Sequence, residues 1–152
     1  MTLLKSVNVL WISKLPNLVR VGLAHSKLAN DPMQVFQALP SLQDLFLFVT
    51  SVVEQLCFGA TGFQKLKRLR LIDLIGLKRV KIEDGTLPLL EKLMIGLCPQ
   101  LEELPSGIRH LSKLTTLTFI DLQEELKLSM IPDQGRNFEI VKHIPYIHFL
   151  ES

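Results

Sequence analysis

The sequence predicts an α/β solenoid, a horseshoe of stacked repeats with a parallel sheet of about five strands on its concave side. Five segments begin 24 residues apart, at Leu15, Leu39, Phe63, Leu87 and Leu111. In each segment the first, fourth, seventh and ninth residues are Leu, Ile, Val or Phe, which gives the pattern LxxLxxLxL. All twenty positions obey the pattern, so the period is a property of the chain rather than a coincidence.

The spacing inside each segment explains the expected strand. The last two apolar positions are two residues apart, so both side chains point to the same side of an extended strand. One repeat cannot bury these side chains alone, whereas stacked repeats bury them in a continuous core and pair their strands into a parallel sheet. The pattern is that of a leucine-rich repeat.

The segments that return from one strand to the next are expected to differ. Asp31 and Pro32 resemble a helix start, which predicts a short helix through Gln37. The sequence SVVE at 51–54 has the capping-box pattern and predicts a second helix that Gly59 ends.

The two later returns have no helical pattern. Residues 77–86 alternate apolar and polar side chains and turn at Asp84 and Gly85, so they are expected to be extended. Residues 98–108 contain two prolines and a Pro-Ser-Gly turn, which favours tight 3₁₀ structure. The convex side is therefore predicted to mix helical, 3₁₀ and extended segments.

Five repeats are expected to fill residues 15–130, with different structure at each end. Residues 131–152, with a short helix after Asn137, are predicted to form a C-terminal cap over the last strand edge. Residues 1–14 are interpreted as the remnant of a preceding repeat or an imperfect N-terminal cap. If the N-terminal edge is uncapped, the chain could self-associate through it, or the chain would be one end of a longer solenoid.

Composition narrows the class of function. Seventeen Lys and Arg against fifteen Asp and Glu give a net charge of +2, too near balance for a nucleic-acid-binding protein. The two cysteines, Cys57 and Cys98, form no CxxC pair, which favours a reducing compartment. No signal peptide, glycosylation sequon or apolar run of roughly 20 residues is visible, so we expect a cytoplasmic protein without a membrane span.

The residues between the strand leucines are predicted to face solvent on the concave side, where neighbouring repeats align them in columns. Two phenylalanines fall there beside basic side chains, and exposed aromatics with arginine are typical of interface hot spots. We therefore predict a partner-binding surface on this face. Its residues are Phe46, Phe48, Arg68, Arg70, Lys92 and Met94.

A second interpretation of this face is purely structural. One column carries side chains of alternating charge, Arg20, Asp44 and Arg68, which would form surface ion pairs that contribute little to stability. In this interpretation a neighbouring segment of the chain covers the two phenylalanines. Arg68 and Lys92 would face each other on neighbouring strands, where like charges are destabilising unless compensated. The candidates for compensation are Asp44, Glu91 and Asp73.

No residue pattern predicts catalysis, a cofactor or a metal site. Cys98 occupies the repeat position at which a small side chain turns inward and satisfies backbone groups, and Cys57 is expected in the core. His143 and His148 are separated by Pro145 and have no acidic or thiol ligand to complete a metal site. No nucleophile elbow, paired-carboxylate motif or HExxH occurs, so the chain is predicted not to be an enzyme.

Two stretches carry a resemblance to a known family: LPLLEKLMIGLCPQLEELPSGIRHLSKLTTLTF, from residue 87, and EIVKHIPYIHF, from residue 139. Over about residues 11–152 the chain resembles the C-terminal leucine-rich-repeat region of plant intracellular immune receptors, the nucleotide-binding disease-resistance proteins with a coiled-coil N-terminus. The resemblance implies a sensor that contacts pathogen effectors or host proteins and holds the receptor inactive beforehand. The nucleotide-binding signature GxxxxGK[ST] does not occur in these 152 residues, so the chain is not expected to bind ATP or ADP or to signal alone.

These observations favour a protein-recognition module in plant defence. Its partner would be a pathogen effector, a host protein or another domain of the same receptor. The alternative is a free-standing cytoplasmic scaffold or adaptor that presents the same concave face to a host protein.

Overall fold

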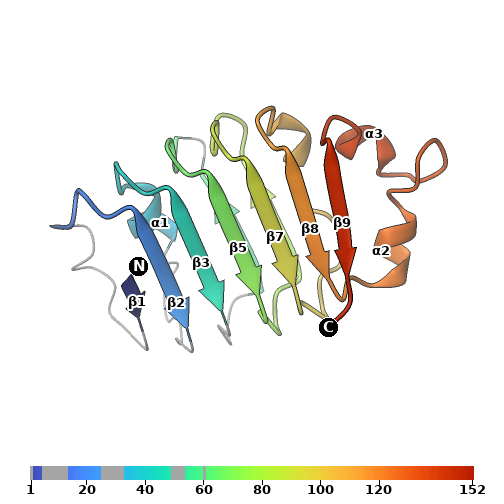
Figure 1. Cartoon of the computed structure of the whole chain (residues 1–152), viewed down its shortest axis with the longest axis horizontal. Helices are drawn as coiled ribbons and strands as arrows, with labels where there is room; N and C mark the ends of the chain where they lie inside the picture. Colours follow the sequence, from blue (N-terminus) through green and yellow to red (C-terminus); the bar gives the residue numbers. More distant parts are fainter. Residues whose placement is uncertain (1, 5–13, 25–32, 49–53, 60) are drawn as a thin grey trace.

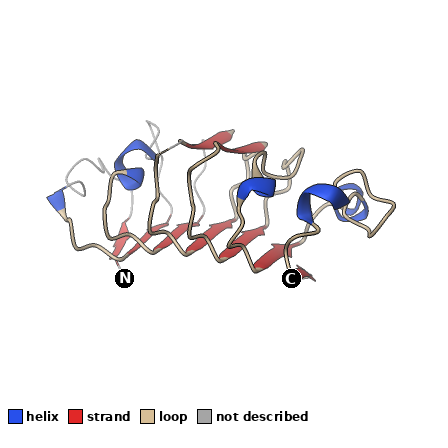
Figure 2. Cartoon of the chain, turned by 90° about the horizontal axis from the view of Figure 1, so that it is seen from above, coloured by secondary structure: helices blue, strands red, loops and turns tan. Residues whose placement is uncertain are grey.

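The chain folds into two layers joined by regular turns, a long sheet and a layer of return segments behind it (Figures 1 and 2). This computed structural model describes all residues except 1, 5–13, 25–32, 49–53 and 60. In Figure 2 the sheet lies on one side, and the chain crosses repeatedly to the return layer on the other side. The expected α/β solenoid of leucine-rich repeats is confirmed.

Within the described residues, the main sheet has seven parallel strands in the order β1-β2-β3-β5-β7-β8-β9. It contains the five strands predicted from the repeat and adds one strand at each end. The strands are β1 (Thr2–Leu4), β2 (Arg20–Ala24), β3 (Asp44–Phe48), β5 (Arg68–Ile72), β7 (Lys92–Gly96), β8 (Thr116–Ile120) and β9 (Tyr146–Leu150).

The register of the sheet reproduces the sequence period. From β2 to β8 each residue pairs with the residue 24 positions further on, as Asp44 does with Arg68 and Arg68 does with Lys92. Only the outermost pairs differ: Thr2 lies opposite Val21, and Thr116 lies opposite Tyr146. Equivalent positions of the five repeats therefore stand in straight columns across the sheet.

Main-chain hydrogen bonds also join the repeats just before each strand. The Gln43 carbonyl accepts from the amides of Lys67 and Arg68, at 2.8 and 3.0 Å. The Lys67 carbonyl accepts in the same way from Glu91 and Lys92, at 2.9 and 3.0 Å. Each turn is thus held to the preceding one by backbone groups that the side-chain sequence does not alter.

The return layer has the predicted mixture of structure. Its elements are the short helix α1 (Met33–Gln37), the paired strands β4 (Gln55–Phe58) and β6 (Arg79–Ile82), and the 3₁₀ helix η2 (Ile108–His110). The extended third return is confirmed by β6. The first helix does run through Gln37, while its expected start at residues 31 and 32 lies outside the described residues.

Two expectations for this layer were wrong. Where a helix was expected to continue to Gly59, the chain forms β4, because Leu56 and Phe58 alternate into the core and the strand pairs with β6 in the 24-residue register. The SVVE motif itself lies mostly outside the described residues. In the fourth return, 3₁₀ structure begins only at Ile108, since Ser106 bridges to Lys81 and continues the line of β4 and β6.

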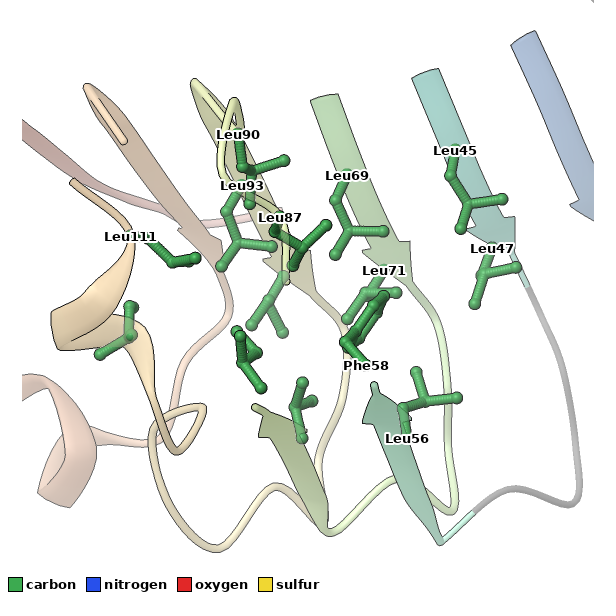
Figure 3. Packing of buried hydrophobic residues seen from close by; sticks show 14 of the residues in the cluster. Leu45, Leu47, Leu56, Phe58, Leu69, Leu71, Leu87, Leu90, Leu93 and Leu111 are labelled. Atoms are coloured by element: carbon green, nitrogen blue, oxygen red, sulfur yellow. The ribbon is translucent and has the colours of Figure 1, made fainter. Parts of the chain in front are cut away.

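The core lies between the two layers (Figure 3). Eighteen of the twenty repeat positions are buried, with no more than 5% of the residue surface exposed. The exceptions are in the first repeat, where Leu15 is exposed and Leu18 is half-buried. Figure 3 shows Leu69 and Leu71 of β5 pointing toward Phe58 of the return layer, so the inward leucines of the sheet pack against buried residues of the return segments.

The C-terminal segment extends the solenoid. After β8 a longer return contains the helices α2 (Glu124–Leu128) and α3 (Phe138–Val141), and β9 then pairs along the outer edge of β8. The short helix after Asn137 is confirmed by α3, and Glu124 and Glu125 form the first turn of α2. The Ser152 amide donates to the Asp121 carboxylate at 2.9 Å, and the Ser152 hydroxyl also donates to it. These hydrogen bonds lower the pKa of Asp121.

At the N-terminal end, β1 pairs with β2, and residues 5–13 lie outside the described part of the chain. The interpretation of residues 1–14 as a remnant or a cap stays a prediction, as does the division of the chain at residue 131. None of the helices in the described part of the chain has the length and apolar character needed to cross a bilayer.

Gly107 is the glycine that the fold requires most strictly. Its φ of 83° lies in the left-handed region that side chains disfavour. A Cβ atom built on Gly107 would lie 2.0 Å from the Ile82 carbonyl oxygen, a backbone atom of the neighbouring repeat. The glycine of the Pro-Ser-Gly turn thus allows two returns to approach closely.

Gly107→Ala is therefore expected to destabilise the chain by about 2 kcal/mol or more, because backbone strain and a steric clash act together. Urea unfolding followed by circular dichroism measures the change. Gly59→Ala is the matched control, since its Cβ would meet only the flexible end of the Gln37 side chain, at 3.1 Å. Equal stability of the two variants would contradict the role assigned to Gly107.

Candidate functional site

The outward side of the sheet, here called the strand face, carries the candidate site. Figure 1 looks onto this face, with the return layer behind it. Every second residue of each strand points outward, and the residues between them are buried. The outward residues of β2, β3, β5, β7 and β8 are Arg20, Gly22, Ala24, Asp44, Phe46, Phe48, Arg68, Arg70, Ile72, Lys92, Met94, Gly96, Thr116, Thr118 and Ile120.

An aromatic and charged cluster occupies the middle of the strand face. The rings of Phe46 and Phe48 stack with their centroids 5.7 Å apart, at an angle of 29°. The Arg70 guanidinium lies over the Phe46 ring, 4.6 Å from its centroid, within the range of a cation–π interaction. Phe46, Phe48 and Arg70 thus lie together on one face, and their role in binding a partner stays a prediction. Phe46 and Phe48 are half-buried rather than fully exposed, since the two rings and Arg70 cover part of one another.

Asp44 holds Arg70 in place. Its carboxylate accepts hydrogen bonds from Arg70 Nη2 at 3.3 and 3.5 Å, and its side chain is only 11% exposed. The second terminal nitrogen makes no such contact, and Arg70 Nε is buried without a hydrogen-bond partner in the described part of the chain. Arg70 is therefore held by one carboxylate and one ring, which give its side chain a defined position on the strand face.

The neighbouring basic residues are not neutralised in this way. Arg68 and Lys92 are direct partners across β5 and β7, and both are exposed. Asp44 was one of the candidates for compensating them, but its carboxylate pairs with Arg70. No ion pair links either basic residue to any carboxylate among the residues that the structure describes. The alternating salt ladder of the structural interpretation is therefore absent from this part of the face.

A shallow hollow of about 380 Å³ opens on this part of the strand face. Its charged lining consists of four basic residues and one carboxylate, Arg20, Arg68, Arg70, Lys92 and Asp44, and its apolar lining consists of Leu69, Leu93 and Met94. Thr116 and Thr118 of β8 complete the far side. Arg68, Arg70, Lys92 and Met94 thus share one depression, and Phe46 stands beside it under Arg70.

Three residues of this site were not among the predicted partner-binding residues. Thr116 and Thr118 line the hollow from β8. Asp44 was treated as a partner for Arg68, directly opposite it, whereas the carboxylate reaches diagonally to Arg70. The column alignment indicated all three positions, but the choice between a direct and a diagonal partner depends on side-chain rotamers.

The two cysteines are free thiols in different surroundings. Cys98 is buried and lies 3.3 Å from the Gly96 carbonyl oxygen, which confirms its inward structural position. Burial raises the pKa of the Cys98 thiol; a hydrogen bond with the Leu74 backbone opposes the rise, and Asp73 adds to it. Cys57 was expected in the core but is half-buried, because it alternates with the inward residues of β4.

The period, the parallel sheet and the open strand face define the chain as a leucine-rich-repeat solenoid. Its homologues are plant disease resistance proteins, which confirms the resemblance found in the sequence. The chain is 35% identical over 143 residues to the disease resistance protein RPM1 of Arabidopsis thaliana. It is 28% identical over 136 residues to the probable disease resistance RPP8-like protein 4, and 32% identical over 132 residues to the probable disease resistance protein At1g58390, both from the same plant.

These alignments cover most of this chain and a small part of each relative. They include 93, 89 and 86% of the chain but only 15, 15 and 14% of RPM1, the RPP8-like protein and At1g58390. The chain thus spans about one seventh of the length of these proteins. No model of a protein family matches the chain.

The thiol surroundings predict unequal reactivity. In the native chain Cys57 is expected to react with Ellman's reagent at least tenfold faster than Cys98, because only the thiolate reacts and burial keeps the Cys98 thiol protonated and covered. The absorbance of the released thiolate gives the two rates, and Cys57→Ser assigns them. After unfolding in urea both thiols should react alike. Two fast thiols in the native chain would rule out the buried position of Cys98.

Proposed function

We propose that this chain is a protein-recognition module that binds its partner through the strand face. The observation that carries the proposal is the cluster of Phe46, Phe48 and Arg70, which is held in a defined geometry on the uncovered side of the sheet. Aromatic residues and arginine are the side chains that dominate binding energy at protein interfaces. A cluster that is already ordered loses less conformational entropy when a partner binds.

The homologues support a role in plant defence. We propose that the chain is the sensing part of an intracellular immune receptor in the cytoplasm, and that it acts by binding rather than by catalysis. Its partner would be a pathogen effector, a host protein or another domain of the same receptor. Because the chain spans about 15% of its first relatives, the activities of the whole proteins are part of this proposal.

Two features support binding over chemistry. The hollow is open and shallow, so it exposes its contents to water rather than enclosing a reacting group. The Cys98 thiol is buried, and burial raises its pKa, so this cysteine is unsuited to attack a substrate.

Phe46→Ala combined with Arg70→Ala is expected to weaken partner binding at least tenfold, because it removes the ring and the cation that form the centre of the surface. The immobilised chain and its variant are compared by quantitative capture of proteins from plant leaf extract. Any partner captured by the unchanged chain is then produced and titrated against both.

The control is Arg109→Ala with Lys113→Ala, which removes exposed basic side chains in and just after η2. A circular dichroism melt confirms that each variant is folded. Equal retention of every captured protein by the Phe46 and Arg70 variant would contradict the proposed surface.

A further inference from the structure

We propose that the strand face recognises an acidic segment of a partner protein, with carboxylates that contact Arg68 and Lys92 and an apolar or aromatic side chain that packs against Phe46 and Met94. This inference rests on the proposed function and names the chemistry of the partner. Its basis is an unbalanced row of charge whose position and surroundings the structure defines.

The charge imbalance follows from the pairing of Asp44. The first outward position reads Arg20, Asp44, Arg68 and Lys92 across four neighbouring strands. The one carboxylate of this row is buried against Arg70, which belongs to the next column. In the described part of the chain no ion pair involves Arg20, Arg68 or Lys92. Three cations therefore remain without a bound counter-charge.

Other charges near the row do not cancel it. Glu91 and Lys67 lie at the entry to the strands and line a second shallow hollow together with Arg20 and Arg68. Glu91 and Lys67 have opposite charges, so together they do not change the net charge near the row. The surplus of positive charge thus stays with the outward residues of β2, β5 and β7.

This arrangement costs stability in the free chain. Arg68 and Lys92 stand directly opposite each other, and like charges at such positions repel. A residue pair kept for the fold alone would have an opposite or neutral partner. An anionic ligand placed between the two side chains removes the repulsion and gains charge-assisted hydrogen bonds, so the binding energy is concentrated at this point.

The surroundings determine what kind of anion fits. The hollow beside Arg68 and Lys92 holds about 380 Å³ and has an apolar floor at Leu69, Leu93 and Met94. A volume at the low end of ligand sites, with a wide opening, suits side chains of a segment that continues across the face. The Phe46 ring, ordered by Arg70, offers an adjacent apolar contact. A peptide with both carboxylates and a large apolar side chain complements all three features.

The test uses a library of random twelve-residue peptides displayed on phage and selected on the immobilised chain. The unchanged chain is expected to enrich peptides that combine Asp or Glu with Phe, Leu, Tyr or Trp. Selected peptides are then synthesised and titrated against Arg68→Gln with Lys92→Gln, which should weaken binding about tenfold or more. Raising the salt from about 0.05 M to about 0.5 M should weaken binding to the unchanged chain, because added ions screen exposed charges.

Arg109→Gln with Lys113→Gln is the matched control, since it also removes one arginine and one lysine from the exposed surface and should leave binding unchanged. Thermal melts provide a second, independent reading. Removing Arg68 and Lys92 should leave the melting temperature unchanged or raise it, because a repulsive pair disappears. A clear fall in melting temperature would show that the pair serves the fold and would overturn the inference.

The outcomes also separate this inference from the proposed function. If the selected peptides carry no acidic bias and bind the Gln variant equally well, but lose affinity with Phe46→Ala, the strand face is a binding surface and the acidic partner is wrong. If no peptide is enriched, or if binding is insensitive to all of these substitutions, both proposals fail. Acidic peptides that lose affinity with the Arg68 and Lys92 variant and with Phe46→Ala, but not with the Arg109 and Lys113 control, support the inference.

Discussion

The structure depends on one constraint, the 24-residue register between neighbouring turns. From β2 to β8 each strand of the main sheet pairs with the next at this offset, and a carbonyl just before a strand, such as that of Gln43, accepts two amides of the following turn. These bonds are made by the backbone, so they require only that every turn has the same length. Given equal lengths, the inward leucines stack into one core and the outward residues form columns. Both the stability of the chain and the layout of its surface follow from this spacing.

The sheet could be predicted because its period is repeated five times, whereas the return layer depends on local competition. At residues 51–59 a helix-capping pattern favoured a helix, but Leu56 and Phe58 bury more effectively in a strand that pairs with β6. The prediction that Cys57 lies in the core was wrong for the same reason. In β4 its side chain points to the side opposite to Leu56 and Phe58, away from the core. β9 was not predicted because it does not follow the 24-residue period. The repeat between β8 and β9 is six residues longer than that period, as the pairing of Thr116 with Tyr146 shows.

The sequence predicted where the residues of the candidate site lie on the sheet, but not which side chains contact one another. Columns place Phe46, Arg70 and Met94 next to one another whatever their side chains do. The sequence could not show that Asp44 turns toward Arg70, because that choice depends on burial, rotamers and the ring beneath the guanidinium. This single contact changes the interpretation of the whole face, since it leaves Arg68 without its expected partner. The ordered cluster and the unbalanced charge thus have one origin.

The alternation along each strand also has a consequence for how such a chain changes over generations. The inward residues form the core, and the outward residues form the surface of the strand face, so the two sets point to opposite sides of the same backbone. A substitution at an outward position such as Met94 leaves the inward leucines in place, so mutation can change the chemistry of this surface with little loss of stability. The sheet is a fixed grid on which the outward side chains are interchangeable, and a change of surface chemistry does not need a new fold.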